Sequence, residues 1–465
     1  MTSSPSYNLR TFYILIITQT LSLIGSRISS LAVGIWIFQD TGNVTPLALV
    51  GFFAVAPMVL ASSLAGVLAD RWDRRIVMVL SDAGQAVGTV LLLISFLSGD
   101  FQLWHLYVIT AFQAVFGVFQ GPAFQASVTM LIPDNHRDRA NAIQQLTGPM
   151  AGIAAPTLAA VVYAAFDVEG AILVDLATFV IAMIVVFSVH IPRPTQTEAG
   201  LAMKGTVLRE MLGGMRFIWD RRLLIVIMIY VALLNFLANS VSVLNTPYIL
   251  ARTGNNEAAL GVILSITNIG AIVGGIAIGI WGGTRPRMYT ILPSIIIFGA
   301  YLALVGMSQT VFTLALTSFM VMLPLPIGNA LFISILQAKV PPDIQGRVFA
   351  VVSQISMLLI PVSFLIIGPL ADNVFERAVG QAGWDVVAPL VGTSVGSGMG
   401  LMYVIGGLMI VGITVVVLAI PATREMESRL PDYTPVVVST EDATQESIDA
   451  PAPTSETATL PNPTL

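Results

Sequence analysis

Long apolar stretches recur along the whole chain, and they restrict its fold more than any other feature. A helix needs about 20 apolar residues to cross a hydrocarbon core about 30 Å thick. Unbroken runs exclude the short alternating strands of a membrane β-barrel. The pattern therefore predicts an all-α integral membrane protein with twelve transmembrane helices. The twelve stretches are 12–38, 46–69, 76–97, 104–131, 143–166, 170–191, 223–250, 258–282, 289–308, 311–338, 347–371 and 398–420.

The composition agrees with a membrane body and restricts the chemistry. Only 10% of the 465 residues are charged, against about 25% in soluble domains. The chain has no cysteine and three scattered histidines, which argues against disulfides, thiolate nucleophiles and Cys- or His-based metal centres. It also contains no Walker A sequence, so ATP hydrolysis is not expected. We therefore expect no enzyme, no metal site, no cofactor and no nucleic-acid partner.

The basic residues indicate how the chain is oriented in the membrane. Of the 21 Lys and Arg residues, all except Arg27, Arg252 and Arg377 fall at the ends of the stretches that share a side with the N-terminus. The positive-inside rule assigns that side to the cytoplasm. The chain is thus predicted to be a multi-pass protein of the cell membrane, with both termini cytoplasmic.

Two short segments on that predicted cytoplasmic side resemble each other at an offset of 208 residues. Repeated bundles of this kind place a binding site between them at mid-membrane, although Pro and Arg are common wherever helices leave a membrane. We predict two pseudo-symmetric six-helix bundles at 1–191 and 223–420, a basic cytoplasmic linker at 192–222 and a disordered acidic tail at 421–465. The matched pairs are Ile132 and Val340, Pro133 and Pro341, Arg139 and Arg347, and Ala142 and Ala350.

The loop between the second and third stretches carries a family resemblance. It reads Gly66-Val67-Leu68-Ala69-Asp70-Arg71-Trp72-Asp73-Arg74-Arg75, which resembles the major facilitator superfamily signature G-x-x-x-D-[RK]-x-G-[RK]-[RK]. Asp73 stands where the signature has its second glycine, as in macrolide-efflux-type members. The segments 132–142, 346–349 and 368–372 also look like that drug-exporter branch, which includes enterobactin exporters. The resemblance implies the major facilitator fold and efflux of small molecules.

The same resemblance implies a gating role for this loop. It places the Asp70 carboxylate against the start of helix 11, where guanidinium groups and the positive end of that helix can hold it. The alternative is that the arginines only anchor the topology. The gating candidates are Gly66, Asp70, Arg71, Arg74 and Arg75.

Helix 5 contains Gly148, Pro149, Gly152 and Pro156, which look like the exporter motif G-P-x-x-G-G with alanines replacing glycines. Small residues four apart let two helices approach closely, and a proline permits a bend. An exporter-type helix 5, with Gly148, Gly152 and Pro156 as its motif, and generic close packing are the two readings.

Ionisable groups inside a membrane are functional candidates by default. Arg27, near the middle of helix 1, can bind an anionic group or pair structurally with a carboxylate. Asp175 in helix 6 can take up and release a proton, or lie at a wet interface. Relatives often carry an arginine where this chain has Gln113. One hypothesis is that Arg27 has taken over that charge, and Arg27 and Asp175 are the proton-coupling candidates.

Two helical stripes suggest how a substrate is recognised. Phe112 and Phe116 share one face of helix 4, and Asn235 and Asn239 share one face of helix 7. Aromatic faces and amides suit a large amphipathic substrate, although phenylalanine facing lipid is the ordinary alternative. The resemblance places helices 1, 4, 7 and 10 around the cavity. The cavity candidates are Gln19, Arg27, Phe112, Gln113, Phe116, Asn235, Asn239 and Asn329.

These observations favour a secondary active exporter of hydrophobic or amphipathic small molecules, such as drugs or macrolides. The expected mechanism is proton antiport by alternating access, and the expected partners are a small-molecule substrate, protons and the lipid bilayer around a monomer. The alternatives are export of a physiological solute, such as a siderophore or lysophospholipid, and a non-transporting sensor with the same fold.

Overall fold

The protein is a bundle of helices. The computed structural model describes residues 9–71, 74–132, 136–189, 219, 222–340, 342–425 and 427, with no strand among them. The predicted linker 192–222 and tail 421–465 lie for the most part outside the described residues, so their boundaries stay predictions.

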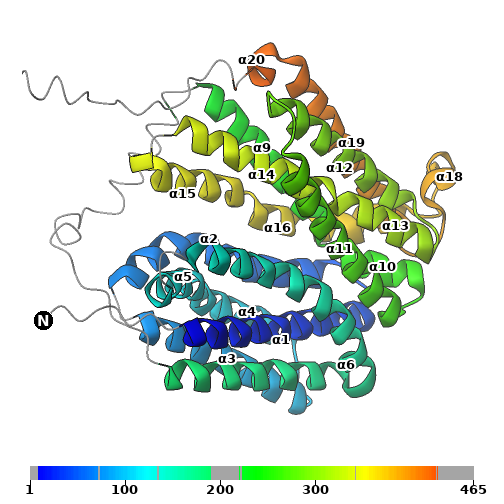
Figure 1. The fold of residues 1–465 in the computed structure, drawn as a ribbon. Helices are drawn as coiled ribbons and strands as arrows, with labels where there is room; N and C mark the ends of the chain where they lie inside the picture. Colours follow the sequence, from blue (N-terminus) through cyan, green and yellow to red (C-terminus); the bar gives the residue numbers. More distant parts are fainter. Residues whose placement is uncertain are drawn as a thin grey trace, which may run out of the picture.

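The helices gather into two groups in Figure 1, which shows α1 to α6 in one half and α9 to α20 in the other. The first group consists of α1 (Leu9–Thr41), α2 (Thr45–Arg71), α3 (Arg74–Leu97), α4 (Leu103–Gly117), α5 (Gln120–Leu131) and α6 (Arg137–Ser188).

The second group begins with α9 and contains several helices that are broken in two. Its members are α9 (Arg222–Ser242), α10 (Asn245–Thr253), α11 (Glu257–Trp281), α12 (Met288–Met307), α13 (Val311–Met322), α14 (Pro324–Lys339), α15 (Pro342–Leu358), α16 (Ile360–Leu370), η2 (Ala371–Phe375), α17 (Glu376–Ala378), η3 (Trp384–Val386), α18 (Ala388–Val391), α19 (Ser397–Ala419) and α20 (Pro421–Arg424).

These helices account for the twelve predicted crossings. Ten described helices or helix pairs are long and apolar enough to span a membrane. One of them, Ile143–Ser188, contains two predicted stretches, which are divided at Asp167 with φ 57° and ψ −165°. The predicted stretch 104–131 is the remaining crossing, which is broken into the shorter helices α4 and α5. The described helices therefore form an all-α membrane body with twelve crossings.

Prolines account for two breaks that the apolar pattern alone does not indicate. Pro324 stands at the start of α14 and Pro361 stands near the start of α16. A proline has no backbone N–H and clashes with the preceding turn, so it is favoured where a helix begins. The predicted stretches 311–338 and 347–371 thus each consist of two helices.

The long connection 371–396 folds against the second half. The indole of Trp384 is buried and donates to the Gly392 carbonyl at 2.9 Å. Arg252 reaches into this segment from α10 and donates to the Val391 carbonyl at 2.5 Å. The Glu376 carboxylate accepts the Met399 N–H at 2.7 Å at the start of α19. This connection therefore packs against α10 and the start of α19 at one end of the second half.

The two halves touch through small residues. Helix α6 packs against α11, and α2 packs against α16. A Cβ added at Gly261 of α11 would lie 2.8 Å from the Pro156 carbonyl oxygen of α6, and one at Gly368 of α16 would lie 2.7 Å from Thr45 Cα. Only glycine permits this approach of backbones, as expected for small-residue contacts between membrane helices.

Candidate functional site

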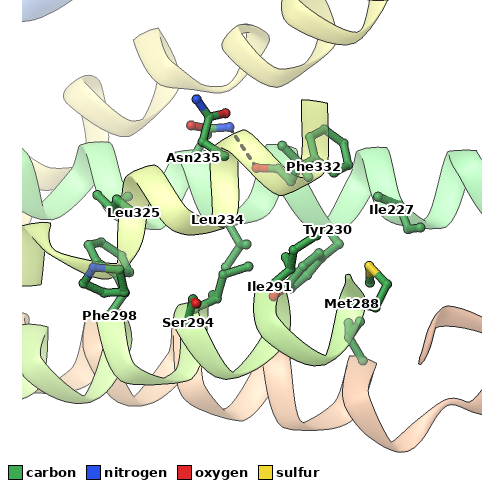
Figure 2. Close-up of a pocket in the computed structure, with 17 residues that line it drawn as sticks. Ile227, Tyr230, Leu234, Asn235, Met288, Ile291, Ser294, Phe298, Leu325 and Phe332 are labelled. Atoms are coloured by element: carbon green, nitrogen blue, oxygen red, sulfur yellow. Dashed lines mark hydrogen bonds between the residues drawn. The ribbon is translucent and has the colours of Figure 1, made fainter. Parts of the chain in front are cut away.

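A hollow with a cavity volume of about 180 Å³ lies inside the second half, between α9, α12, α14 and α19. Figure 2 shows side chains from these helices facing one another across it. Most of its wall is aliphatic or aromatic, with the amides of Asn235 and Asn329 and the hydroxyls of Tyr230 and Ser294 among the apolar groups. The apolar members include Ile227, Leu234, Ile291, Phe298, Leu325 and Phe332.

A second hollow, with a cavity volume of about 290 Å³, adjoins the first and has a more polar wall. Both hollows are lined by Asn235, Ala238, Phe298 and Leu325, so the two spaces meet along α9. Besides Asn235, the polar side chains of the second hollow are Asn239, Ser242, Asn245, Thr267, Ser318 and Tyr403.

No Asp, Glu, Lys, Arg or His is among the described residues that line either hollow. Burying a charge in such surroundings is costly without a charged or strongly hydrogen-bonding partner. The combined space has the mixture of apolar wall and few polar groups that is typical of small-molecule sites.

The stripe predicted on the seventh stretch, 223–250, lies on α9. The amides of Asn235 and Asn239 form a polar seam along the two hollows. Asn235 Nδ2 donates to the Val231 carbonyl at 3.1 Å, and Asn239 Nδ2 donates to the Asn235 carbonyl at 2.8 Å. Each amide nitrogen is therefore bonded to its own helix. Asn329, predicted separately on helix 10, lines the same first hollow.

Arg27 lies outside both hollows, where α1 meets α6 and α11. Its Nη1 donates to the Gly148 carbonyl at 3.2 Å. A Cβ added at Gly152 would lie 3.2 Å from this Nη1 and would also meet the side chain of Asn268 on α11. The guanidinium is half-buried, and it has no carboxylate partner among the described residues.

The motif predicted on the fifth stretch, 143–166, lies in α6, beside this contact between the halves. Gly148 receives the Arg27 hydrogen bond, and Gly152 makes room for Arg27 and Asn268. The Pro156 carbonyl lies where α11 comes closest, at Gly261. Close packing across the halves is thus observed at Gly152 and Pro156, whereas Gly148 contacts Arg27 of its own half and a Cβ added there would have nothing within 4 Å.

The helix 4 candidates lie mainly against α3. The side chain of Gln113 occupies the space above Gly88, and the ring of Phe116 occupies the space above Gly84. Gln113 Nε2 donates at 3.1 Å both to the Gln85 carbonyl and to Thr89 Oγ1. Phe112 is 37% exposed, and its ring centre lies 4.8 Å from that of Phe116.

Asp175 is 4% exposed and joins three helices. Its carboxylate accepts Ser26 Oγ of α1 at 2.9 Å and Thr89 Oγ1 of α3 at 3.1 Å. Hydroxyls are the only side-chain donors to it within the described residues. The carboxylate is therefore buried and hydrogen-bonded, and its role in proton coupling stays a prediction.

A second buried carboxyl escaped the sequence analysis as a site. Asp82 of α3 is fully buried and accepts Gln120 Nε2 at 2.6 Å. The same nitrogen donates to Gln19 Oε1 of α1 at 2.7 Å, while Gln85 donates to Gln120 at 2.8 Å. The candidate Gln19 is therefore part of a polar network in the first half. Polar side chains on three otherwise apolar stretches were the available signal.

The gating motif lies partly outside the described residues. Nothing is described for the side chains of Gly66, Asp70, Arg71 and Arg74, so the gating role of this loop stays a prediction. The Arg75 guanidinium donates to the Phe187 carbonyl at the end of α6, which ties α3 to α6 within the first half.

Comparison with known sequences gives one consistent family. Residues 15–364 match the Major Facilitator Superfamily. The chain is 26% identical over 370 residues to macrolide efflux protein A of Streptococcus pyogenes, covering 78% of this chain and 90% of that protein. It is 22% identical over 362 residues to the multidrug efflux pump Tap of Mycolicibacterium fortuitum, covering 75% and 86%.

Solved structures share the fold at low identity. A bacterial homologue of the human lysosomal transporter Spinster, in an inward-facing and unoccupied conformation, aligns with a TM-score of 0.67 and 14% identity over 93% of this chain and all of the other. The nucleoside transporter NupG aligns with a TM-score of 0.66 and 13% identity, covering 88% and 98%. Together with the twelve apolar helices, these similarities establish that the chain belongs to the Major Facilitator Superfamily of membrane transporters.

Proposed function

We propose that the protein is a secondary active exporter of hydrophobic or amphipathic small molecules. The observation that supports this most directly is the pair of adjoining hollows along α9, whose wall is apolar apart from a seam of amides and hydroxyls. Such a wall favours an apolar ligand through contact area and orients it through few polar groups. The efflux relatives support the same direction of transport.

The positive-inside rule supports a cytoplasmic position for both termini. In that orientation, α10, α13 and α18, which lie in Figure 1 at the end of the molecule opposite the first turn of α1, face the outside. At that outer end Gln39 of α1 donates to Glu257 of α11 at 2.5 Å, and Asp372 accepts hydrogen bonds from the start of α2. Both contacts join the two halves. Alternating access then requires them to break when the molecule opens outward.

Proton coupling is part of the proposal, with Asp175 and Arg27 as its candidates. Both lie within predicted spans, and neither has an oppositely charged partner among the described residues. Ionisable groups held in this way inside a membrane mark ion pathways in many transporters. Asp70 and its neighbours would gate the inner side, as their motif implies.

The test is a drug-susceptibility panel in an efflux-deficient bacterial host, with and without a protonophore. We expect expression to raise the inhibitory concentration of apolar or amphipathic compounds, and we expect the protonophore to remove that protection. Flux of the same compounds in proteoliposomes would separate an exporter from a sensor. An unchanged panel together with absent flux would contradict the proposed function.

A further inference from the structure

The side-chain amides of Asn235 and Asn239 on α9 are oriented alike. In both, the nitrogen is hydrogen-bonded and the oxygen is left available. The nitrogens of Asn235 and Asn239 donate to carbonyls of their own helix, as Figure 2 shows for Asn235. Reversing either amide would place its oxygen against a carbonyl oxygen, so this orientation is fixed by the backbone. Among the described residues, no group donates to the side-chain oxygen of Asn235 or of Asn239.

These two oxygens lie one helical turn apart on a single face of α9. Asn235 lines both hollows and Asn239 lines the second, so the seam runs from the apolar space into the polar one. Removing a polar atom from water costs free energy when it finds no new hydrogen-bond partner. The seam therefore favours a ligand that brings a hydrogen-bond donor to it.

The charge of the ligand follows from the wall around the seam. Since no Asp, Glu, Lys, Arg or His of the described ranges lines either hollow, neither an anion nor a cation would find a counter-charge among these lining residues. An anion would in addition face the amide oxygens, which repel it. Loss of hydration without a charged partner disfavours both kinds of ion.

We propose that the two hollows form one bipartite site for an uncharged amphipathic ligand, with its apolar body among Ile291, Leu325 and Phe332 and a hydroxyl or N–H donor on the oxygens of Asn235 and Asn239. This inference rests on the proposed function, because it assigns the substrate class of that exporter. It places recognition inside the second half rather than between the halves at Arg27.

The test measures equilibrium binding to the full chain in lipid nanodiscs, with empty nanodiscs as the background. The probes are estradiol, its dimethyl ether, which keeps the apolar body without a donor, and its hemisuccinate, which adds a carboxylate. We expect estradiol to bind at least about fivefold more tightly than the ether, as one net hydrogen bond predicts. The hemisuccinate is expected to bind more weakly than estradiol.

Three variants locate the effect. Asn239→Leu and Asn235→Leu should each reduce estradiol affinity about fivefold and leave the ether unchanged. Asn268→Leu is the matched control, because its amide also donates to its own helix, at the Leu264 carbonyl, but it faces Gly152 instead of the hollows. It should retain the preference for estradiol. Thermal unfolding in the same nanodiscs verifies that each variant is folded.

Other outcomes overturn the inference without affecting the proposed function. If Asn268→Leu abolished the preference and Asn239→Leu did not, the ligand would lie between the halves. Equal affinity for estradiol and its ether, tighter binding of the hemisuccinate, or no binding of either neutral probe would each contradict the bipartite site. The susceptibility panel reports export independently, so a positive panel with any of these results leaves the exporter standing.

Discussion

Asp372 of η2, just after α16, caps α2 in the opposite half through Thr45. Its Oδ2 accepts the Thr45 N–H at 2.7 Å and the Thr45 hydroxyl at 2.5 Å, and its Oδ1 accepts the Val44 N–H at 2.8 Å. A carboxylate is favoured at the N-terminus of a helix, where unpaired N–H groups and the helix dipole are positive. Three hydrogen bonds thus connect the halves at the end that we propose faces outward.

We expect Asp372→Ala to favour opening at this end. Loss of hydrogen bonds to a charged group costs about 2 kcal/mol, which changes a two-state equilibrium about 30-fold. Since the chain has no cysteine, spin labels on cysteines introduced at Asn43 and Val374 would report the distance between the halves. We expect a longer distance to become populated in the variant.

Asp385→Asn is the control for this measurement. Asp385 belongs to the same outer segment, in η3, and no contact of its carboxylate with the first half is described. Identical distance distributions in Asp372→Ala and in the parent chain would contradict the latch.

The contact of α11 with α6 predicts opposite effects for two substitutions of the same kind. An added Cβ at Gly261 would lie 2.8 Å from the Pro156 carbonyl oxygen and 2.9 Å from Ala160 Cβ, whereas nothing lies within 4 Å of one at Gly275. We expect Gly261→Ala to destabilise the protein by about 1–3 kcal/mol through overpacking. Gly275→Ala should be neutral or stabilise it by up to about 1 kcal/mol.

Thermal unfolding of both variants in one detergent checks this pair. The midpoint should fall for Gly261→Ala and stay or rise for Gly275→Ala. Equal midpoints would mean that the two halves separate easily enough to accept a methyl group.

The helix count, the family and the amide seam were predictable because each depends on order along the chain. Apolar length specifies the twelve crossings, and helical spacing places Asn235 and Asn239 on one face. The division of 104–131 into α4 and α5 was not predicted, although Gly117, Gly121 and Pro122 stand around the break and were the available signal. Apolar length alone does not indicate such a break.

The surroundings of the predicted residues depend on packing, and the sequence alone did not indicate them. Ser294 and Phe298 of α12 line the hollow, although the family resemblance pointed to helices 1, 4, 7 and 10. Asp82, Gln19 and Gln120 come from three helices and meet only in the fold. No spacing rule connects residues so far apart in sequence.

Arg27 and Gln113 lie in different surroundings. This difference predicts what happens when the positive charge is moved from position 27 to position 113. Arg27 donates to the Gly148 carbonyl of α6, whereas the Gln113 amide donates to the Gln85 carbonyl of α3. We expect Arg27→Ala to reduce export and Gln113→Arg to fail to restore it, because a guanidinium at 113 would enter the space above Gly88.

The measurement is export of one accepted compound by Arg27→Ala alone and by the double variant, at matched expression. Gln113→Arg alone shows whether the substitution is tolerated. Restored export in the double variant would support the hypothesis that Arg27 has taken over the charge that relatives carry on helix 4.

Asp175→Asn separates a proton carrier from a structural anchor. Asparagine keeps an oxygen to accept Ser26 Oγ and has nearly the same shape, so the link between α1, α3 and α6 should survive with a loss of about 1 kcal/mol. It cannot take up and release a proton at neutral pH. If Asp175 carries the proton, the variant should bind substrate normally while losing export that responds to a protonophore.

Asp82→Asn, tested in parallel, shows whether the other buried carboxyl carries the proton, and Asp100→Asn in the exposed connection before α4 is the control. Export by Asp175→Asn that kept its protonophore response would assign Asp175 a purely structural role, because only a group that titrates can transmit the gradient.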